Sequence, residues 1–109
     1  MVADPRIVAL VGPNSSKVAK AQIPITNQAG LLQCSPSSSD PGLTKPRDGA
    51  LDLRSAFPDR ISFVRTGPSD DIQGFALASF VLHDLGTSTA LVVDDTDGGR
   101  EITDQFSAA

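Results

Sequence analysis

The chain has 109 residues, of which 39% are hydrophobic and 20% are charged, as is ordinary for a folded globular domain. The formal net charge is −4 and the basic residues form no dense run, which argues against nucleic acid as a partner because phosphate neutralisation needs clustered Lys and Arg. No apolar stretch reaches the roughly 18 residues that cross a bilayer. The single cysteine, Cys34, excludes an intrachain disulfide and is expected to be a small buried residue.

The beginning of the chain predicts a strand followed by a helix. Residues 6–11 (RIVALV) are apolar and rich in β-branched side chains, which favours a strand covered on both faces, as in a parallel sheet. Ser15 or Ser16 can cap the helix that follows. That helix is expected to run to about Gln28, with a kink at Pro24.

The next stretch predicts a short strand and a long loop. Gly30 is well placed to end the helix. Residues 31–34 are short and apolar enough for a buried strand. Residues 35–58 are rich in proline, glycine, serine and charge, which indicates a long loop with a helical turn near residues 51–55.

The second half predicts strand, helix, strand and the start of a further helix. The two strands are expected at residues 61–65 and 89–93, and apolar residues at near-helical spacing predict a helix over residues 71–85 that ends at Gly86. Residues 100–107 have the character of the first turns of another helix. The order β-α-β-loop-β-α-β-α therefore indicates an α/β fold with a parallel sheet.

Hydroxyl residues follow each of the first two strands. Asn14, Ser15 and Ser16 form one cluster, and residues 35–39 form the other. Because loops at the carboxyl ends of neighbouring parallel strands face the same crevice, the two clusters are expected to form half of a small-ligand site. The alternatives are an ordinary helix N-cap for Ser16 and a flexible polar loop for the second cluster.

Other residues suggest weaker alternatives. Asp94, Asp95 and Asp97 could form a metal or phosphoryl-acceptor cluster, but their spacing fits no calcium loop, and a solvated turn at the end of a strand is the better explanation. Residues 12–17 (GPNSSK) lack the second glycine of a phosphate-binding loop. His83 is the only histidine and is expected to be a surface or half-buried residue of a helix rather than a catalytic base, because residue order alone indicates no serine–histidine–acid set.

Residues 7–44, IVALVGPNSSKVAKAQIPITNQAGLLQCSPSSSDPGLT, resemble the centre of the amino-terminal lobe of type I periplasmic binding proteins. Within that family they are most similar to the leucine/branched-chain amino-acid group, which serves ABC transporters. Two later stretches fit in the same order, LTKPRDGALDLRSAFPDRISFVRTGPSDDIQGFALASFVLHDLG and TALVVDDTDGGREITDQFSAA. The resemblance implies that residues 1–109 form a single incomplete, partial Rossmann-like lobe of a two-lobed domain, without its first strand–helix pairs.

The resemblance also implies site residues. Ser16, four positions after the glycine that ends the first strand, takes the place of a serine that contacts the ligand's amino-acid head group. The turn after the next strand supplies backbone and hydroxyl contacts, for which the matching residues are Ser37, Ser38 and Ser39. Gly98 stands where the family commonly has an aromatic residue that closes over the ligand.

The implied function is a non-enzymatic substrate-binding component of an ABC transporter for branched-chain or related amino acids. It needs neither a cofactor nor a metal. Its partners would be the amino acid and a membrane permease. Its location would be periplasmic or extracellular, with or without a lipid anchor.

Two alternatives remain open at the level of sequence. A receiver-like signalling domain could use Asp94 and Asp95, although receiver domains place their acidic pair after the first strand. The chain could instead be a truncated fragment without independent activity. In that case exposed sheet edges are expected to favour self-association.

Overall fold

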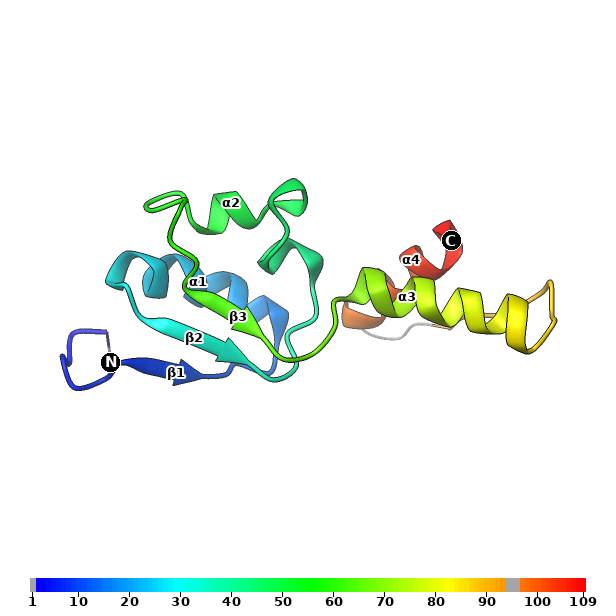
Figure 1. The fold of residues 1–109 in the computed structure, drawn as a ribbon, viewed down its shortest axis with the longest axis horizontal. Helices are drawn as coiled ribbons and strands as arrows, with labels where there is room; N and C mark the ends of the chain where they lie inside the picture. Colours follow the sequence, from blue (N-terminus) through cyan, green and yellow to red (C-terminus); the bar gives the residue numbers. More distant parts are fainter. Residues whose placement is uncertain (1, 94–96) are drawn as a thin grey trace. The chain divides into compact units, whose positions relative to one another are not determined.

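The computed structural model describes residues 2–93 and 97–109. The chain divides into two compact units, Met1–Gly67 and Pro68–Ala109. We call the first the sheet unit because it carries the β-sheet, and the second the helical unit because its regular structure is helical (Figure 1).

The sheet unit contains three parallel strands in the order β1-β2-β3. The strands are β1 (Ala9–Val11), β2 (Leu32–Ser35) and β3 (Phe63–Arg65). Helix α1 (Ser16–Ala29) makes the crossover from β1 to β2, and in Figure 1 it passes behind β3. The predicted α/β class and parallel sheet are confirmed, although β1 and β3 are shorter than the runs that predicted them and β2 is displaced by one residue.

Helix α1 begins and ends where its sequence predicts. Ser15 has the extended backbone of an N-cap residue, with φ −101° and ψ 130°. Gly30 adopts the left-handed conformation at φ 70°, and its N–H donates to the carbonyl of Asn27 while that of Leu31 donates to Thr26. These two bonds satisfy carbonyls that the end of a helix would otherwise leave unpaired.

Replacing Gly30 with alanine is expected to lower the free energy of unfolding by about 1–2 kcal/mol, because a Cβ disfavours the left-handed conformation. Urea denaturation measures the loss. Gly30→Asn is the matched control and is expected to lose less, since asparagine tolerates this conformation. Equal stability of the alanine variant and the natural chain would contradict this explanation of the helix end.

One face of the sheet packs against α1. The buried core consists of Ala19, Ile23, Leu43 and Phe63, with Leu53 packed against it. The loop after β2 covers this core through the short helical segments η1 (Pro41–Leu43) and η2 (Pro46–Asp48) and helix α2 (Ala50–Leu53). The loop predicted over residues 35–58 therefore holds more helical turns than the one expected, because its prolines begin two of them.

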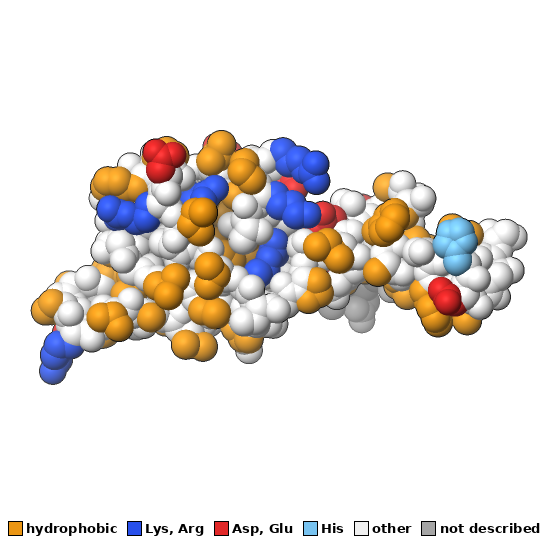
Figure 2. All heavy atoms as spheres, viewed as in Figure 1, with side chains coloured by type: hydrophobic (Ala, Val, Ile, Leu, Met, Phe, Trp, Pro, Cys, Tyr) orange, Lys and Arg blue, Asp and Glu red, His pale blue; other side chains and the backbone are white. Residues whose placement is uncertain are grey.

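The opposite face of the sheet is open within the sheet unit. Val11 is 84% exposed, and Leu32 and Val64 are also exposed, while Cys34 between them is half-buried. Figure 2 shows apolar side chains, in orange, on the surface of this unit. The expectation that residues 6–11 form a strand covered on both faces is wrong within this unit, because its helices lie on one face and β1 is an edge strand.

The helical unit contains α3 (Asp70–Ser79), a continuation η3 (Phe80–Asp84) and α4 (Asp97–Ala108). Gly86 follows with φ 60°, so the predicted helix over residues 71–85 and its stop are confirmed. His83 lies in η3 and is exposed, as expected. Among the described residues, no helix is both long enough and apolar enough to span a membrane.

The predicted strand at residues 89–93 does not form. Leu91 is 89% exposed, and Val93 is 80% exposed. Within the described part of the chain, this run pairs with no strand. β-branched residues favour a strand only when a neighbour supplies the ladder hydrogen bonds and a surface to pack against, so propensity alone misleads here.

Candidate functional site

Two loops meet at the carboxyl edge of the sheet. The first loop, residues 12–15, follows β1, and the serine loop, residues 36–40, follows β2. The Ser37 hydroxyl donates to the Asn14 carbonyl at 3.0 Å, and the Ser38 hydroxyl donates to the Pro13 carbonyl at 3.1 Å. The expectation that the two hydroxyl clusters come together is confirmed, while their role in ligand binding stays a prediction.

Ser16 joins α1 to the serine loop. Its Oγ accepts hydrogen bonds from the backbone N–H groups of Ser39 at 3.0 Å and Asp40 at 3.1 Å. The N-cap position belongs to Ser15, whose side chain makes no capping hydrogen bond. The interpretation of Ser16 as an ordinary helix cap is therefore wrong, because its hydroxyl bonds the neighbouring loop instead.

The predicted serines differ in how accessible their hydroxyls are. Ser38 is 1% exposed, so its hydroxyl stabilises the loop from inside. Ser37 is exposed, and its hydroxyl donates to the first loop. Ser39 is half-buried and, among the described residues, its hydroxyl has no hydrogen-bond partner. Of the serine-loop hydroxyls, that of Ser39 is the most available to a ligand.

Asp40 is the last residue of the serine loop and was not among the predicted site residues. Its buried carboxylate accepts from the Gly42 N–H at 2.6 Å and forms an ion pair with Lys20 of α1. A buried carboxylate with a hydrogen bond and a cation beside it is compensated for its loss of water. Asp40 therefore acts as a structural anchor at the end of the loop.

Arg65 is the second residue that sequence reasoning missed. It is the last residue of β3, the strand next to β2. Its Nη1 donates to the carbonyls of Asp40 at 2.8 Å and Ser38 at 3.3 Å, and its Nη2 donates to the Thr44 hydroxyl at 2.6 Å. The sequence could have indicated Arg65, because the rule that places the first loop and the serine loop at one edge of the sheet also places the end of β3 at that edge.

The charge around the first turn of α1 suits an electron-rich group. That turn contains no acidic side chain, and Lys17 is exposed within it. The N-terminus of a helix carries a partial positive charge from its unpaired N–H groups. Because two N–H groups already occupy the acceptor capacity of the Ser16 oxygen, the chemistry left to this hydroxyl is to donate its proton.

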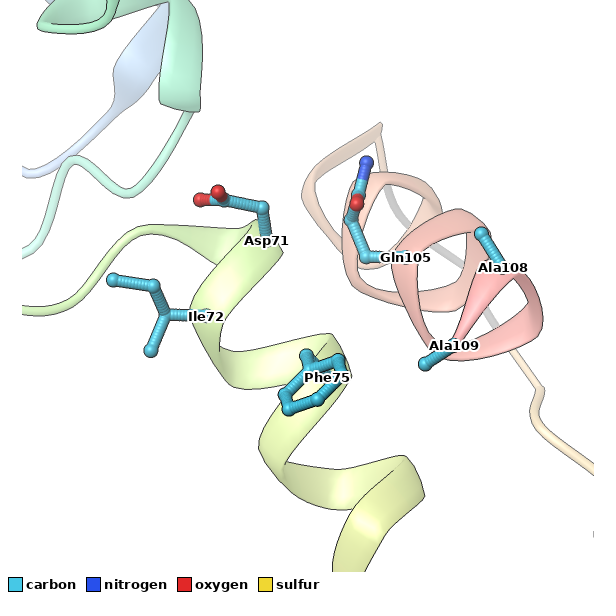
Figure 3. A pocket seen from close by; sticks show the side chains of 6 residues that line it. All are labelled: Asp71, Ile72, Phe75, Gln105, Ala108 and Ala109. Carbon is cyan, nitrogen blue, oxygen red and sulfur yellow. The ribbon is translucent and has the colours of Figure 1, made fainter.

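Two hollows are lined by other residues of the chain. One of about 360 Å³ lies within the helical unit and is lined by Asp71, Ile72, Phe75, Gln105, Ala108 and Ala109. Figure 3 shows that these side chains come from α3 and from the end of the chain at α4. The other, of about 390 Å³, is lined by residues 56–60. Neither contains a residue of the two loops.

The structure describes only part of the acidic cluster formed in the sequence by Asp94, Asp95 and Asp97. Asp94 and Asp95 lie outside the residues that the structure describes, and Asp97 and Gly98 begin α4. Across residues 2–93 and 97–109, no group of three or more His, Cys, Asp and Glu side chains could hold a metal ion. The metal and receiver-like alternatives, and the role of Gly98, stay predictions.

Comparisons with known proteins point to one family. The family model described as receptor family ligand binding region matches residues 1–109, which is the whole chain. Comparison with curated proteins and comparison with solved structures gave no match.

Proposed function

Because the chain belongs to the receptor family ligand binding region, we propose that it binds a small carboxylate-bearing ligand at the edge formed by the first loop and the serine loop. In this proposal residues 1–109 are one incomplete lobe of a two-lobed domain, and closure of the second lobe completes the site. No bond in the ligand is made or broken. Closure shifts the population of the domain toward the form that a partner recognises.

The Ser16 hydroxyl is the observation that supports a carboxylate. Its oxygen accepts from the N–H groups of Ser39 and Asp40, so its proton is directed to an acceptor outside these loops. Accepting two hydrogen bonds also polarises the O–H group and strengthens it as a donor. A ligand ammonium group would find no acceptor at this oxygen, whereas a carboxylate would find a donor beside a helix N-terminus.

The finer proposal is a substrate-binding component of an ABC transporter for branched-chain or related amino acids. It rests on the resemblance of residues 7–44 to the leucine-binding group, together with the serine-bearing edge. The partner would be a membrane permease, and the location would be periplasmic or extracellular, with or without a lipid anchor. Of the predicted serines, Ser16, Ser37 and Ser39 supply the contacts, with the hydroxyls of Ser16 and Ser39 foremost, while the buried Ser38 holds the loop from inside.

Isothermal calorimetry with L-leucine, L-isoleucine and L-valine tests this function. We expect saturable binding that Ser16→Ala and Ser39→Ala each weaken about tenfold, since each removes one hydrogen bond to a charged group. L-leucinol, which has a hydroxymethyl group in place of the carboxylate, is expected to bind much more weakly than L-leucine.

Ser55→Ala is the control, because Ser55 is exposed and lies in the loop after α2. It should leave the affinity unchanged. Equal affinity for leucine and leucinol would rule out carboxylate recognition. A folded chain that binds none of the three amino acids would rule out a site formed by these residues alone.

A further inference from the structure

The backbone around Ser39 is held from two sides. On one side, the N–H groups of Ser39 and Asp40 donate to the Ser16 hydroxyl at 3.0 and 3.1 Å. On the other, the carbonyls of Ser38 and Asp40 accept from the Arg65 guanidinium at 3.3 and 2.8 Å. The peptide group between Ser38 and Ser39 is thus bonded at both ends, through its oxygen to Arg65 and through its nitrogen to Ser16.

The geometry of arginine suits this role. The guanidinium is a planar fork with several donors in fixed directions, so it can hold several acceptors at once. Arg65 uses it to bond two carbonyls of the serine loop and the hydroxyl of Thr44, which follows η1. A lysine has a single rotatable ammonium and cannot hold three separated acceptors with the same directions.

The hydroxyl of Ser39 is left out of this network. Ser39 is half-buried, and its side chain has no hydrogen-bond partner within the described part of the chain. Its backbone is fixed while its hydroxyl stays available. In binding sites, a polar group held in place before the ligand arrives avoids the entropy cost of ordering it on binding.

We propose that Arg65 and Ser16 are positioning residues that clamp the backbone on both sides of Ser39 and so fix the direction in which its hydroxyl meets a ligand. The role of the clamp in ligand binding rests on the proposed function, but the clamp itself can be measured without any ligand. It adds a second role for Ser16 and gives Arg65 a role in positioning the site.

Amide hydrogen exchange at Ser39 and Asp40 tests the clamp directly. Ser16→Ala is expected to speed exchange at both amides about tenfold or more, and Ser16→Thr, which keeps the hydroxyl, is expected to restore protection. Arg65→Met and Arg65→Lys are expected to speed exchange at the same two amides by a similar factor, because the loop opens more often once its carbonyls are released.

A double variant separates a clamp from a general effect on stability. In the Ser16→Ala background the two amides have already lost their acceptor, so adding Arg65→Lys is expected to change their exchange little. If Arg65 only stabilises the fold, the two substitutions would add independently. Arg65→Lys keeps the charge and most of the volume, so the test is decided on it if Arg65→Met does not fold.

Ser15→Ala and Arg47→Met are the matched controls. Both residues are exposed, Ser15 neighbours Ser16 in sequence, and Arg47 lies outside the serine loop. Neither variant should alter exchange at Ser39 or Asp40. Unchanged exchange in both Arg65 variants, or additive effects in the double variant, would overturn the proposal.

Titration with L-leucine connects the clamp to binding. We expect Arg65→Lys to weaken the affinity and to speed exchange together, whereas Ser39→Ala should weaken the affinity without altering exchange at the Asp40 amide. If the natural chain does not bind L-leucine, a site formed by these residues alone is ruled out, and the exchange experiments still decide whether the clamp exists. If exchange at Ser39 and Asp40 becomes faster while the affinity for L-leucine stays constant, the clamp has no role in positioning Ser39 for the ligand.

Discussion

Replacing Phe63 with alanine is expected to lower the free energy of unfolding of the sheet unit by about 3–5 kcal/mol. Phe63 is 3% exposed and packs with Ala19, Ile23 and Leu43 in the core. The loss combines the transfer free energy of the ring with the cavity that remains after it is removed. Because a small domain has only about 5–15 kcal/mol of stability, this substitution removes a large part of it.

Urea denaturation followed by circular dichroism measures this effect. Phe75→Ala is the matched control, because Phe75 is 63% exposed and loses little buried area on truncation. Phe63 also lies two residues before Arg65 on β3, so loosening of the strand should reach the serine loop. If both alanine variants unfold at the same urea concentration as the natural chain, the core assignment is wrong.

Replacing Gly74 with alanine is expected to separate α3 from α4. A Cβ at Gly74 would lie 2.6 Å from the Cβ of Gln105, 2.8 Å from the Ile102 carbonyl oxygen and 2.9 Å from the Phe106 nitrogen. Two of these are backbone atoms of α4, so the helix must move. Although alanine favours a helix over glycine by about 1 kcal/mol, the crowding is expected to give a net loss of about 1–3 kcal/mol.

Hydrogen exchange along α4 measures this separation, since its amides should lose protection while those of the sheet unit keep theirs. Gly67→Ala is the control, because a Cβ there would lie 3.4 Å from the Pro36 carbonyl, an ordinary contact. The same movement should change the hollow between α3 and α4 in Figure 3. Full protection of α4 in the Gly74 variant would show that the two helices do not depend on this close approach.

Features with a local cause could be predicted from the sequence. The ends of α1 and of the helix that finishes before Gly86 depend on glycines in the left-handed conformation, and such glycines are visible without a structure. The alternation of strands and helices indicated parallel crossovers, and the matching family model agrees with that lobe type. The meeting of the two hydroxyl clusters could be predicted from the same parallel topology.

Features that depend on partners distant in sequence could not be predicted in this way. The apolar run at residues 89–93 has high β propensity, yet it lacks a neighbouring strand among the described residues. The Ser16 hydroxyl could cap a helix or bond the serine loop, and only the three-dimensional distance decides between them. Arg65 looked like one member of an alternating strand, because nothing local marks its guanidinium as a partner for loop carbonyls.

The crossover from β1 through α1 to β2 also has a consequence for the order in which the molecule folds. Ser16 and Ser39 are separated by 23 residues, so their contact closes a short loop of chain. Short loops close faster and lose less entropy than long ones, and domains rich in such contacts fold quickly. The edge that carries Ser16 and Ser39 can therefore form with the first strand pair, early in folding, and Arg65 secures it when β3 joins the sheet.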